Sequence, residues 1–444
     1  MDAAIPHDQL RHSLQTRLGE ARAHTDALFR LVRPEALHDR PIPERHRVVF
    51  YLGHLEAFDW NLVCRGAFNR DSFHEEFDRL FAFGIDPVDG SLPTDRPSDW
   101  PPLPDIATYN QRVRACVDTC LEQAPFSQPK QPALENGIIF HVAIEHRLTH
   151  AETLAYMLHH LPIERKVPPP IVPEPPAPPV APRTVEIPAG TATLGLARSN
   201  HDCSFGWDNE FEAHAVEVPS FSIDVYNVTN GQFLEFLHAG GYQDRTLWTE
   251  SDWEWKSKHG ITHPSFWRRR GQRWYQQNMF AEISLPLDCP VYTSHAEATA
   301  YARWAGKSLP TEAQLHRAAY GTHERGERAY PWGDDAPAGS CGNFNFHRWD
   351  PAPVGAYPAG RSAFGVADLL GNGWEWTSTL FEPFQGFQPF PFYPGYSANF
   401  FDGKHYVIKG ASARTAACLL RRSFRNWFQP HYPYIYAAFR CVEN

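Results

Sequence analysis

The sequence predicts an α+β protein of more than one domain, in which a four-helix bundle precedes a domain of short strands and helices with much irregular structure. Three observations lead to this prediction. Apolar residues recur at helical spacing in the chain up to Leu161. Ten prolines fall between Pro162 and Pro182. From Thr184 onward, short strand-like segments alternate with glycine turns and aromatic residues.

Residues 1–161 are expected to form the bundle. We predict helices at 9–32, 45–67, 106–124 and 136–161. In the first of them the apolar positions repeat every three or four residues: Leu10, Leu14, Leu18, Ala21, Leu28 and Leu31. A long loop over 86–105, rich in proline, aspartate and glycine, should join the second helix to the third. Bundles of this kind place metal ligands on facing inner surfaces of their helices.

Residues 162–183 are predicted to be a semi-rigid linker, because a proline-rich run favours extended polyproline II structure. Residues 184–444 should form the second domain. Its clearest helix is expected at 295–305, and Thr311 precedes a further amphipathic helix in the manner of an N-cap. The remainder is rich in loops, which favours an α+β domain.

Composition excludes several classes of protein. A formal net charge of −10 argues against a protein that binds nucleic acid through phosphates. No apolar run reaches the roughly 18 residues that a membrane span requires. The N-terminal residues lack the features of a secretion signal, so a cytoplasmic location is expected. The eight cysteines form no zinc pattern and are expected to be reduced thiols. Nothing in the sequence defines an oligomeric state.

The chemistry is indicated by a short stretch of the fourth predicted helix. His146 and His150 are four positions apart, so they share one helix face and can close on one metal ion. Glu152 follows two positions later, and His54 lies in the second predicted helix. A His-x3-His pair alone is more often a solvated or core pair. Three neutral imidazoles with open positions suit a redox metal that also binds O2 and substrate.

Motifs in the second half carry a family resemblance. They lie at residues 221–230, 302–313, 330–333, 371–377 and 438–440. Together they resemble the formylglycine-generating-enzyme fold, and the first half resembles a DinB-like helical bundle. This pairing, with His-x3-His-x-Glu in the bundle, is similar to the ergothioneine-biosynthesis sulfoxide synthases. Those enzymes use non-haem iron(II) and O2 to join a thiol sulfur to C2 of the imidazole of hercynine, which is trimethylated histidine.

The resemblance implies a set of iron ligands. They are His54, His146 and His150, whereas Glu152 is expected to support the site without binding the metal. Such a site leaves three positions for two substrates and O2. Holding both reactants on one metal would supply most of the proximity effect. Thr149 stands where relatives can carry a glutamine near the substrate.

The resemblance also implies where hercynine binds. Arg425, Asn426 and Trp427 match the family segment for its carboxylate and trimethylammonium end, with Asn426 donating to the carboxylate. Trp427 and Phe428 are candidate aromatic faces for the quaternary ammonium, worth ~0.5–2 kcal/mol each. Trp427 could equally be a core aromatic residue.

A catalytic tyrosine is implied for some members of the family. Tyr393 aligns best with it and Tyr396 is the second candidate. Its role would be to deliver a proton and to steer the reaction away from plain thiol dioxygenation. Either tyrosine could instead simply pack.

Two departures from the family pattern bear on the thiol. Phe428 stands where the branch that uses γ-glutamylcysteine has an acidic residue. The loop after the second helix lacks an arginine pair, since Arg96 is the only basic residue between Gly84 and Asp105. Both favour free cysteine as the thiol. Arg421 and Arg422 could receive its carboxylate, although as charged surface residues they need no such role.

Other functions remain open at this point. A copper-dependent formylglycine generator needs two close cysteines, and residues 409–420 contain only Cys418. A synthase using a selenosugar, an ovothiol-type synthase and a non-catalytic ligand-binding member of the fold are the alternatives. Asn372 and Glu375 sit where relatives can hold a structural Ca²⁺, and a hydrogen-bonded turn explains them equally well.

Overall fold

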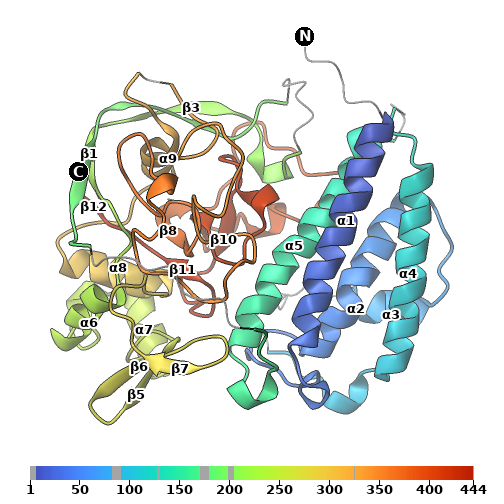
Figure 1. Ribbon diagram of the computed structural model, residues 1–444, viewed down its shortest axis with the longest axis horizontal. Coiled ribbons are helices and arrows are strands. Elements are labelled where there is room, and N and C mark those ends of the chain that lie inside the picture. The colour runs from blue at the N-terminus through green and yellow to red at the C-terminus, as the bar shows by residue number, and fades with distance from the viewer. Residues whose placement is uncertain are drawn as a thin grey trace. The chain divides into compact units, whose positions relative to one another are not determined.

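The computed structural model describes residues 7–82, 92–127, 131–170, 180–198, 205–324 and 326–443. The chain forms two compact units. The first contains the chain up to Pro170 together with Phe205 and Phe390–Pro394, and the second contains most of the chain that follows the proline-rich run. Figure 1 shows the helices of the first unit from blue to green and the mixed elements of the second from green to red.

The first unit is helical. Its long helices run side by side in Figure 1, where α1 packs against α5 and α2 against α4. The α-helices are α1 (His7–Arg30), α2 (Val48–Asp59), α3 (Glu75–Leu80), α4 (Leu103–Gln123) and α5 (Ile138–His159). The shorter helices are η1 (Pro34–Ala36), the π-helix η2 (Trp60–Ala67), η3 (Pro97–Asp99), η4 (Glu135–Gly137) and η5 (Ile163–Arg165). The four predicted helices are thus confirmed, with ends shifted by a few residues.

Burial differs between the helices in the way their sequences require. α5 is buried on all sides, since nearly every residue from Ile139 to His159 is buried, Arg147 and several histidines among them. A helix of that kind belongs in the centre of a bundle. α1 buries only one face, through Leu14, Leu18, Ala21 and Leu28 among others.

The second predicted helix differs from the structure in two ways. It begins at Val48, because Arg47 has an extended backbone, and beyond Asp59 it continues as the π-helix η2. The short helix α3 was not predicted; its N-terminal amide at Phe77 donates to the side chain of His74. Part of the predicted loop over 86–105 lies outside the described residues, and the rest of it contains η3 and the start of α4.

The first residues of the predicted linker are attached to the bundle. The short helix η5 forms there. Lys166 makes an isolated antiparallel β-bridge with Val32, and the amide of Val167 donates to the carbonyl of Leu31 at 2.7 Å. The bounds 162–183 for a linker stay a prediction.

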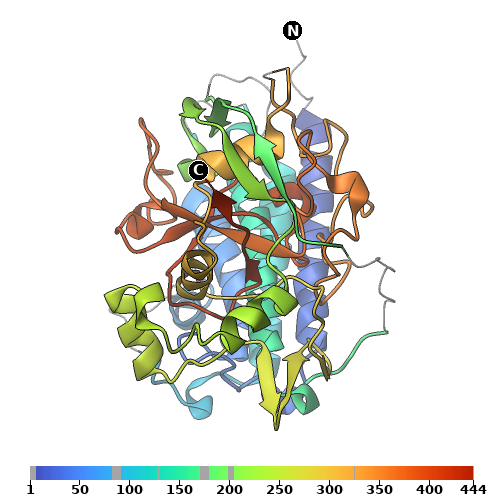
Figure 2. The same cartoon turned by 90° about the vertical axis from the view of Figure 1, so that its left-hand side faces the viewer.

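The second unit combines small sheets with short helices, as predicted for an α+β domain with much irregular structure. Its largest sheet has the order β10-β9-β8-β11, in which β8 pairs antiparallel with β9 and parallel with β11. The other sheets have the orders β1-β4-β12, β5-β6-β7 and β2-β3. Figure 2 shows β5 and β6 as the yellow hairpin at the bottom.

The strands are β1 (Thr184–Ile187), β2 (Gly190–Leu194), β3 (His214–Val218), β4 (Phe221–Asp224), β5 (Trp267–Arg270), β6 (Arg273–Gln277), β7 (Glu282–Ser284), β8 (Gly373–Leu380), β9 (Tyr406–Ala411), β10 (Asn426–Phe428), β11 (Ala437–Ala438) and β12 (Val442–Glu443). The helices are α6 (Asn230–His238), α7 (Glu250–Lys258), α8 (His295–Trp304), α9 (Glu312–Tyr320), η6 (Asp208–Glu210), η7 (Arg245–Leu247), η8 (Pro358–Gly360), η9 (Ala398–Phe400) and η10 (Ala417–Leu419).

Local capping explains where these helices begin. Thr311 accepts a hydrogen bond from the amide of Gln314, whose side chain binds back to the Thr311 amide. The predicted N-cap is therefore confirmed, and it is a complete capping box. The helix predicted at 295–305 is α8, and α6 and α7 were not predicted.

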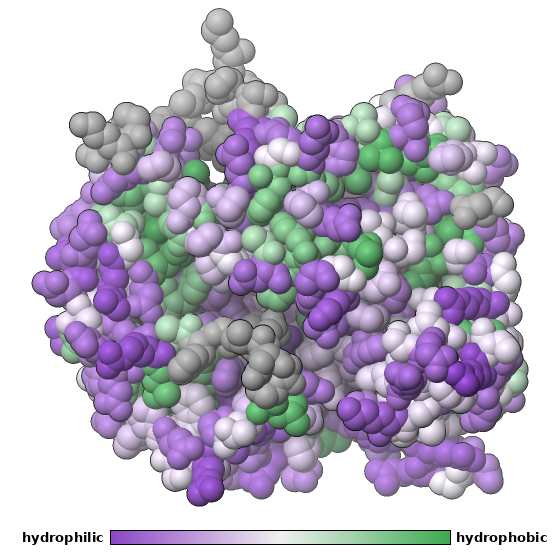
Figure 3. Space-filling model, turned by 180° about the vertical axis from the view of Figure 1, so that it is seen from behind, coloured by the Kyte–Doolittle hydropathy of each residue, from purple (hydrophilic) through white to green (hydrophobic). Residues whose placement is uncertain are grey.

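The surface seen from behind is mostly hydrophilic, with smaller apolar areas scattered over it (Figure 3). Few large apolar side chains are exposed among the described residues, the most exposed being Leu92 and Leu287. Within the described ranges, no helix has both the length and the apolar character needed to cross a bilayer.

Candidate metal centre

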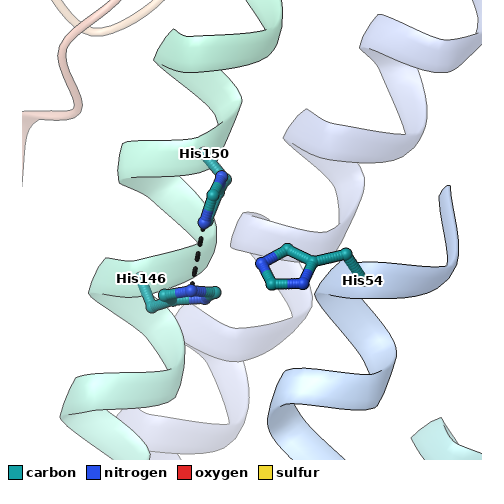
Figure 4. A group of neighbouring side chains, drawn as sticks. All are labelled: His54, His146 and His150. Carbon is teal, nitrogen blue, oxygen red and sulfur yellow. Dashed lines mark hydrogen bonds between the residues drawn. The ribbon is translucent and has the colours of Figure 1, made fainter. Parts of the chain in front are cut away.

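Three histidines of the first unit point toward one another. His54 comes from α2, whereas His146 and His150 lie one turn apart on α5 (Figure 4). One ring nitrogen of each lies within 4.8 Å of the others. No other group of three histidine, cysteine, aspartate or glutamate side chains in the described part of the chain is placed to hold a metal ion.

The three imidazoles are buried and neutral. Their exposed fractions are 5%, 7% and 6% for His54, His146 and His150. Burial lowers the pKa of His54 to about 4, and it holds the pKa values of His146 and His150 well below their usual range. The neighbouring histidines and the Arg147 guanidinium act in the same direction. Neutral imidazole is the form that binds metals, so no proton has to be displaced near neutral pH.

Hydrogen bonds indicate which ring nitrogen of each histidine faces the centre of the cluster. The Nδ1 atom of His54 donates to the carbonyl of Phe81 at 2.7 Å, which leaves Nε2 available to bind a metal ion. The Nε2 atoms of His146 and His150 face each other at 3.1 Å. Two neutral imidazoles in that contact share one proton, whereas a metal would accept a lone pair from each. The donor set therefore fits a metal ion better than it fits a hydrogen-bonded pair.

Aromatic rings hold the imidazoles in place. Phe58, one turn after His54 on α2, stacks on His146 with ring centroids 3.4 Å apart. Phe50 stacks on His54 at 4.8 Å. These apolar faces restrict ring rotation and keep bulk water from the ligands.

A buried network of charges joins α2 and α5, the two helices that carry the three histidines. Arg147 on α5 donates to both carboxylate oxygens of Glu56, at 3.0 and 2.8 Å, and to Asp59 at 2.6 Å, both on α2. Arg114 on α4 joins Glu56 to Asp26 of α1. The network thus links all four long helices of the bundle.

Burial and the neighbouring arginines act in opposite directions on the pKa values of Glu56 and Asp59 in this network. Burial alone would raise the pKa of Glu56, but Arg147 and Arg114 lower it overall, so Glu56 is ionised. Burial raises the pKa of Asp59, and Glu56 adds to that rise. Removing Arg147 would therefore leave two buried carboxylates beside each other.

Two further residues of the motif face other partners. Thr149 is half-buried, and its hydroxyl donates to the carbonyl of Glu145 at 2.8 Å, one turn back on its own helix. Glu152 is buried and does not belong to the group of metal-binding candidates.

The two tyrosine candidates fall in different units. The ring of Tyr393 contacts Phe58 edge-on at 5.3 Å, so one aromatic ring separates it from His146. Tyr396 belongs to the second unit, where it stacks on Trp207 at 3.8 Å and meets Trp427 edge-on.

Asn426, Trp427 and Phe428 of the proposed hercynine segment form β10 and are half-buried. The side-chain oxygen of Asn426 accepts from the Trp427 amide at 2.8 Å, which leaves its NH₂ group to donate. Trp427 stacks on Phe381 at 4.1 Å, and Phe428 stacks on Tyr432 at 5.5 Å. Trp427 is thus part of an aromatic cluster in the second unit.

The three arginine candidates are engaged inside the second unit. Arg425 is buried against Glu312, with 3.1 Å between nitrogen and oxygen. Arg421 pairs with Glu210 at 2.8 Å, and Arg422 pairs with Glu327 at 2.9 Å. The role of Arg421 and Arg422 in holding a substrate carboxylate stays a prediction.

The residues considered for calcium also have protein partners. The side-chain oxygen of Asn372 accepts from Asn343 at 2.9 Å and from the Ala352 amide at 3.0 Å. Glu375 forms a buried ion pair with Arg440. The hydrogen-bonded turn accounts for both residues.

Several residues of the centre were missed in the sequence. Phe58 follows His54 by four positions, and that spacing alone could have placed it on the ligand face. Glu56, Asp59 and Arg147 interrupt apolar helices, which signals buried pairing.

Comparison with known families covers most of the chain. Residues 172–444 match the Sulfatase-modifying factor enzyme 1-like domain, and residues 17–161 match the DinB superfamily.

Three relatives are similar over much of the chain. A hercynine oxygenase of Mycolicibacterium smegmatis is 36% identical over 77% of this chain and 78% of its own length. A hercynine oxygenase of Mycobacterium tuberculosis is 40% identical over 56% of this chain, and Ergothioneine biosynthesis protein 1 of Neurospora crassa is 28% identical over 94%. The matches span 58% and 56% of those two relatives, little more than half of their lengths.

Proposed function

The chain belongs to the hercynine oxygenase family, and on that premise we propose that it is a non-haem iron(II), O2-dependent sulfoxide synthase. The thiol would be free cysteine, and its sulfur would be joined to C2 of the hercynine imidazole. The reaction balances without a further reductant. The thiol S–H and the imidazole C–H bonds break and a C–S bond forms, while one oxygen atom of O2 enters the sulfoxide and the other leaves in water.

The observation that carries the proposal is the buried cluster of His54, His146 and His150. Bound iron(II) would activate O2 and coordinate the reactants. The chain supplies three neutral ligands, fixes the ring of His54 through the Phe81 carbonyl and stacks Phe58 against His146. The apolar rings exclude water, which disfavours side reactions of the activated oxygen.

Tyr393 is the favoured proton donor of this proposal. Its ring packs on Phe58, the residue that stacks on His146, whereas Tyr396 packs on Trp207. The phenol of Tyr393 would supply a proton to the reaction. Asn426, Trp427 and Phe428 remain the candidates for the carboxylate and trimethylammonium end of hercynine, on the basis of the resemblance.

Reconstitution tests the proposal. The protein is loaded anaerobically with Fe(II), hercynine is added, and air is admitted with either cysteine or γ-glutamylcysteine. Mass spectrometry should detect hercynyl-cysteine sulfoxide from free cysteine. Coupling only with the dipeptide would overturn the choice of thiol. No coupled product from either thiol would overturn the proposed activity, and the assay would then turn to selenosugars, to histidine as acceptor and to ligand binding without turnover.

A further inference from the structure

Two cysteines outside the metal centre touch each other inside the first unit. Cys64 lies on η2 and Cys120 on α4, and their Sγ atoms are 3.8 Å apart. Both side chains are buried, and both thiols are free. Cys116, one turn before Cys120 on α4, is partly exposed.

The two cysteines differ in acidity, so that Cys120 is the nucleophile and Cys64 its partner thiol. The Cys64 thiol and, to a smaller extent, the Arg70 guanidinium stabilise a negative charge on Cys120 and lower its pKa to about 7. The same contact with Cys120 raises the pKa of Cys64. A thiolate beside a protonated thiol is the arrangement in which oxidation of the first sulfur is resolved by the second.

We propose that Cys64 and Cys120 form a reversible intramolecular disulfide when a hydroperoxide reaches the protein. The Cys120 thiolate attacks the peroxide oxygen, so that an S–O bond forms, the O–O bond breaks and the leaving oxygen takes a proton from water. The Cys64 sulfur then attacks the sulfur of the Cys120 sulfenic acid. The S–S bond forms, the S–O bond breaks, and the departing hydroxide takes the Cys64 proton and leaves as water.

In this step the two thiols lose two electrons and the peroxide gains them. The disulfide would join η2, which continues the helix that carries His54, to α4. This inference does not depend on the proposed function, because neither cysteine belongs to the group of metal-binding candidates.

The test uses the full chain, without added metal, treated with hydrogen peroxide. Intact mass should fall by two hydrogens, and peptide mapping of all eight cysteines should find Cys64 joined to Cys120. Dithiothreitol should restore both thiols. Cys116→Ser is the matched control, because it removes a thiol one turn away on the same helix, and it should still form the disulfide.

Two variants separate the steps. Cys64→Ser should stop at a sulfenic acid on Cys120 that dimedone traps, and Cys120→Ser should leave Cys64 largely unmodified. Circular dichroism of each variant checks that it folds, and Cys→Ala versions serve if a serine does not. The inference is overturned if Cys64 and Cys120 stay reduced while other thiols oxidise, or if the disulfide joins either of them to Cys116 instead.

Discussion

At the scale of single residues, the metal centre combines predictable and unpredictable contributions. The spacing of His146 and His150 places them on one helix face, and His54 was the third candidate because it lies in another predicted helix. The carbonyl of Phe81 that fixes the His54 ring lies 27 positions away in the sequence. The stacking of Phe58 on His146 depends on how α2 and α5 pair. No local pattern encodes such contacts, so the sequence pointed to the three histidines but not to the groups that hold their rings.

Tyr393→Phe tests the proton donor at this scale. The variant keeps the ring that packs on Phe58 and loses only the hydroxyl. Products should shift from the coupled sulfoxide toward cysteine sulfinate, measured by mass spectrometry after equal O2 consumption. Tyr396→Phe is the control, and its partitioning should match that of the unaltered protein. Unchanged partitioning in Tyr393→Phe would remove this residue from the mechanism.

Asp368 gives a pH-dependent prediction for the second unit. Burial raises the pKa of this carboxyl from 3.8 to about 6, and its oxygen accepts from the Gly355 amide at 2.6 Å. The folded state therefore binds a proton more tightly than the unfolded state. The stability that this gives is present below pH 3.8 and is lost as the pH rises through about 6.

Asp368→Asn keeps a hydrogen-bond acceptor and removes the titration. Between pH 4 and pH 7, the free energy of unfolding in urea should fall by about 2 kcal/mol more for the unaltered protein than for the variant. A difference that stays constant with pH would contradict this account. Asn also tolerates the left-handed backbone of residue 368, whose φ is 55°.

At the scale of elements, periodicity predicted the helices of the bundle but not all of their details. α1, α2, α4 and α5 were found because apolar positions recur over several turns. The π-helical turns of η2 follow α2 without a break in the apolar pattern, so the sequence offered no signal for them. α6 and α7 are only nine residues long each, and few turns give a weak periodicity.

The ion pairs of Arg147 join helix α5 to helix α2. Arg147→Met should remove the arginine that pairs with the buried Asp59 and leave the buried Glu56 with Arg114 alone. The free energy of unfolding should fall by about 3–5 kcal/mol in chemical denaturation. Arg79→Met is the control, because the Arg79–Glu75 pair is exposed, and it should change little. Equal stability of the two variants would show that the network is dispensable.

At the scale of the whole molecule, the predicted family and the two kinds of domain are confirmed. The motifs of the second half and the histidine pair were specific enough to predict this family and both kinds of domain. The grouping of Phe390–Pro394 with the first unit was beyond sequence reasoning, because it depends on tertiary contacts of a segment far along the chain. The roles of Asn426, Trp427 and Phe428 in binding hercynine stay predictions, because they come from the resemblance alone.

The central claim is that His54, His146 and His150 hold the catalytic iron. The measurement that tests it most directly is the iron content of the anaerobically reconstituted protein after desalting, compared with His150→Ala. We expect one iron per chain in the unaltered protein and almost none in His150→Ala, with unchanged circular dichroism. His141→Ala, which removes another buried histidine of α5, should keep its iron. Full iron occupancy and turnover in a folded His150→Ala variant would contradict the account.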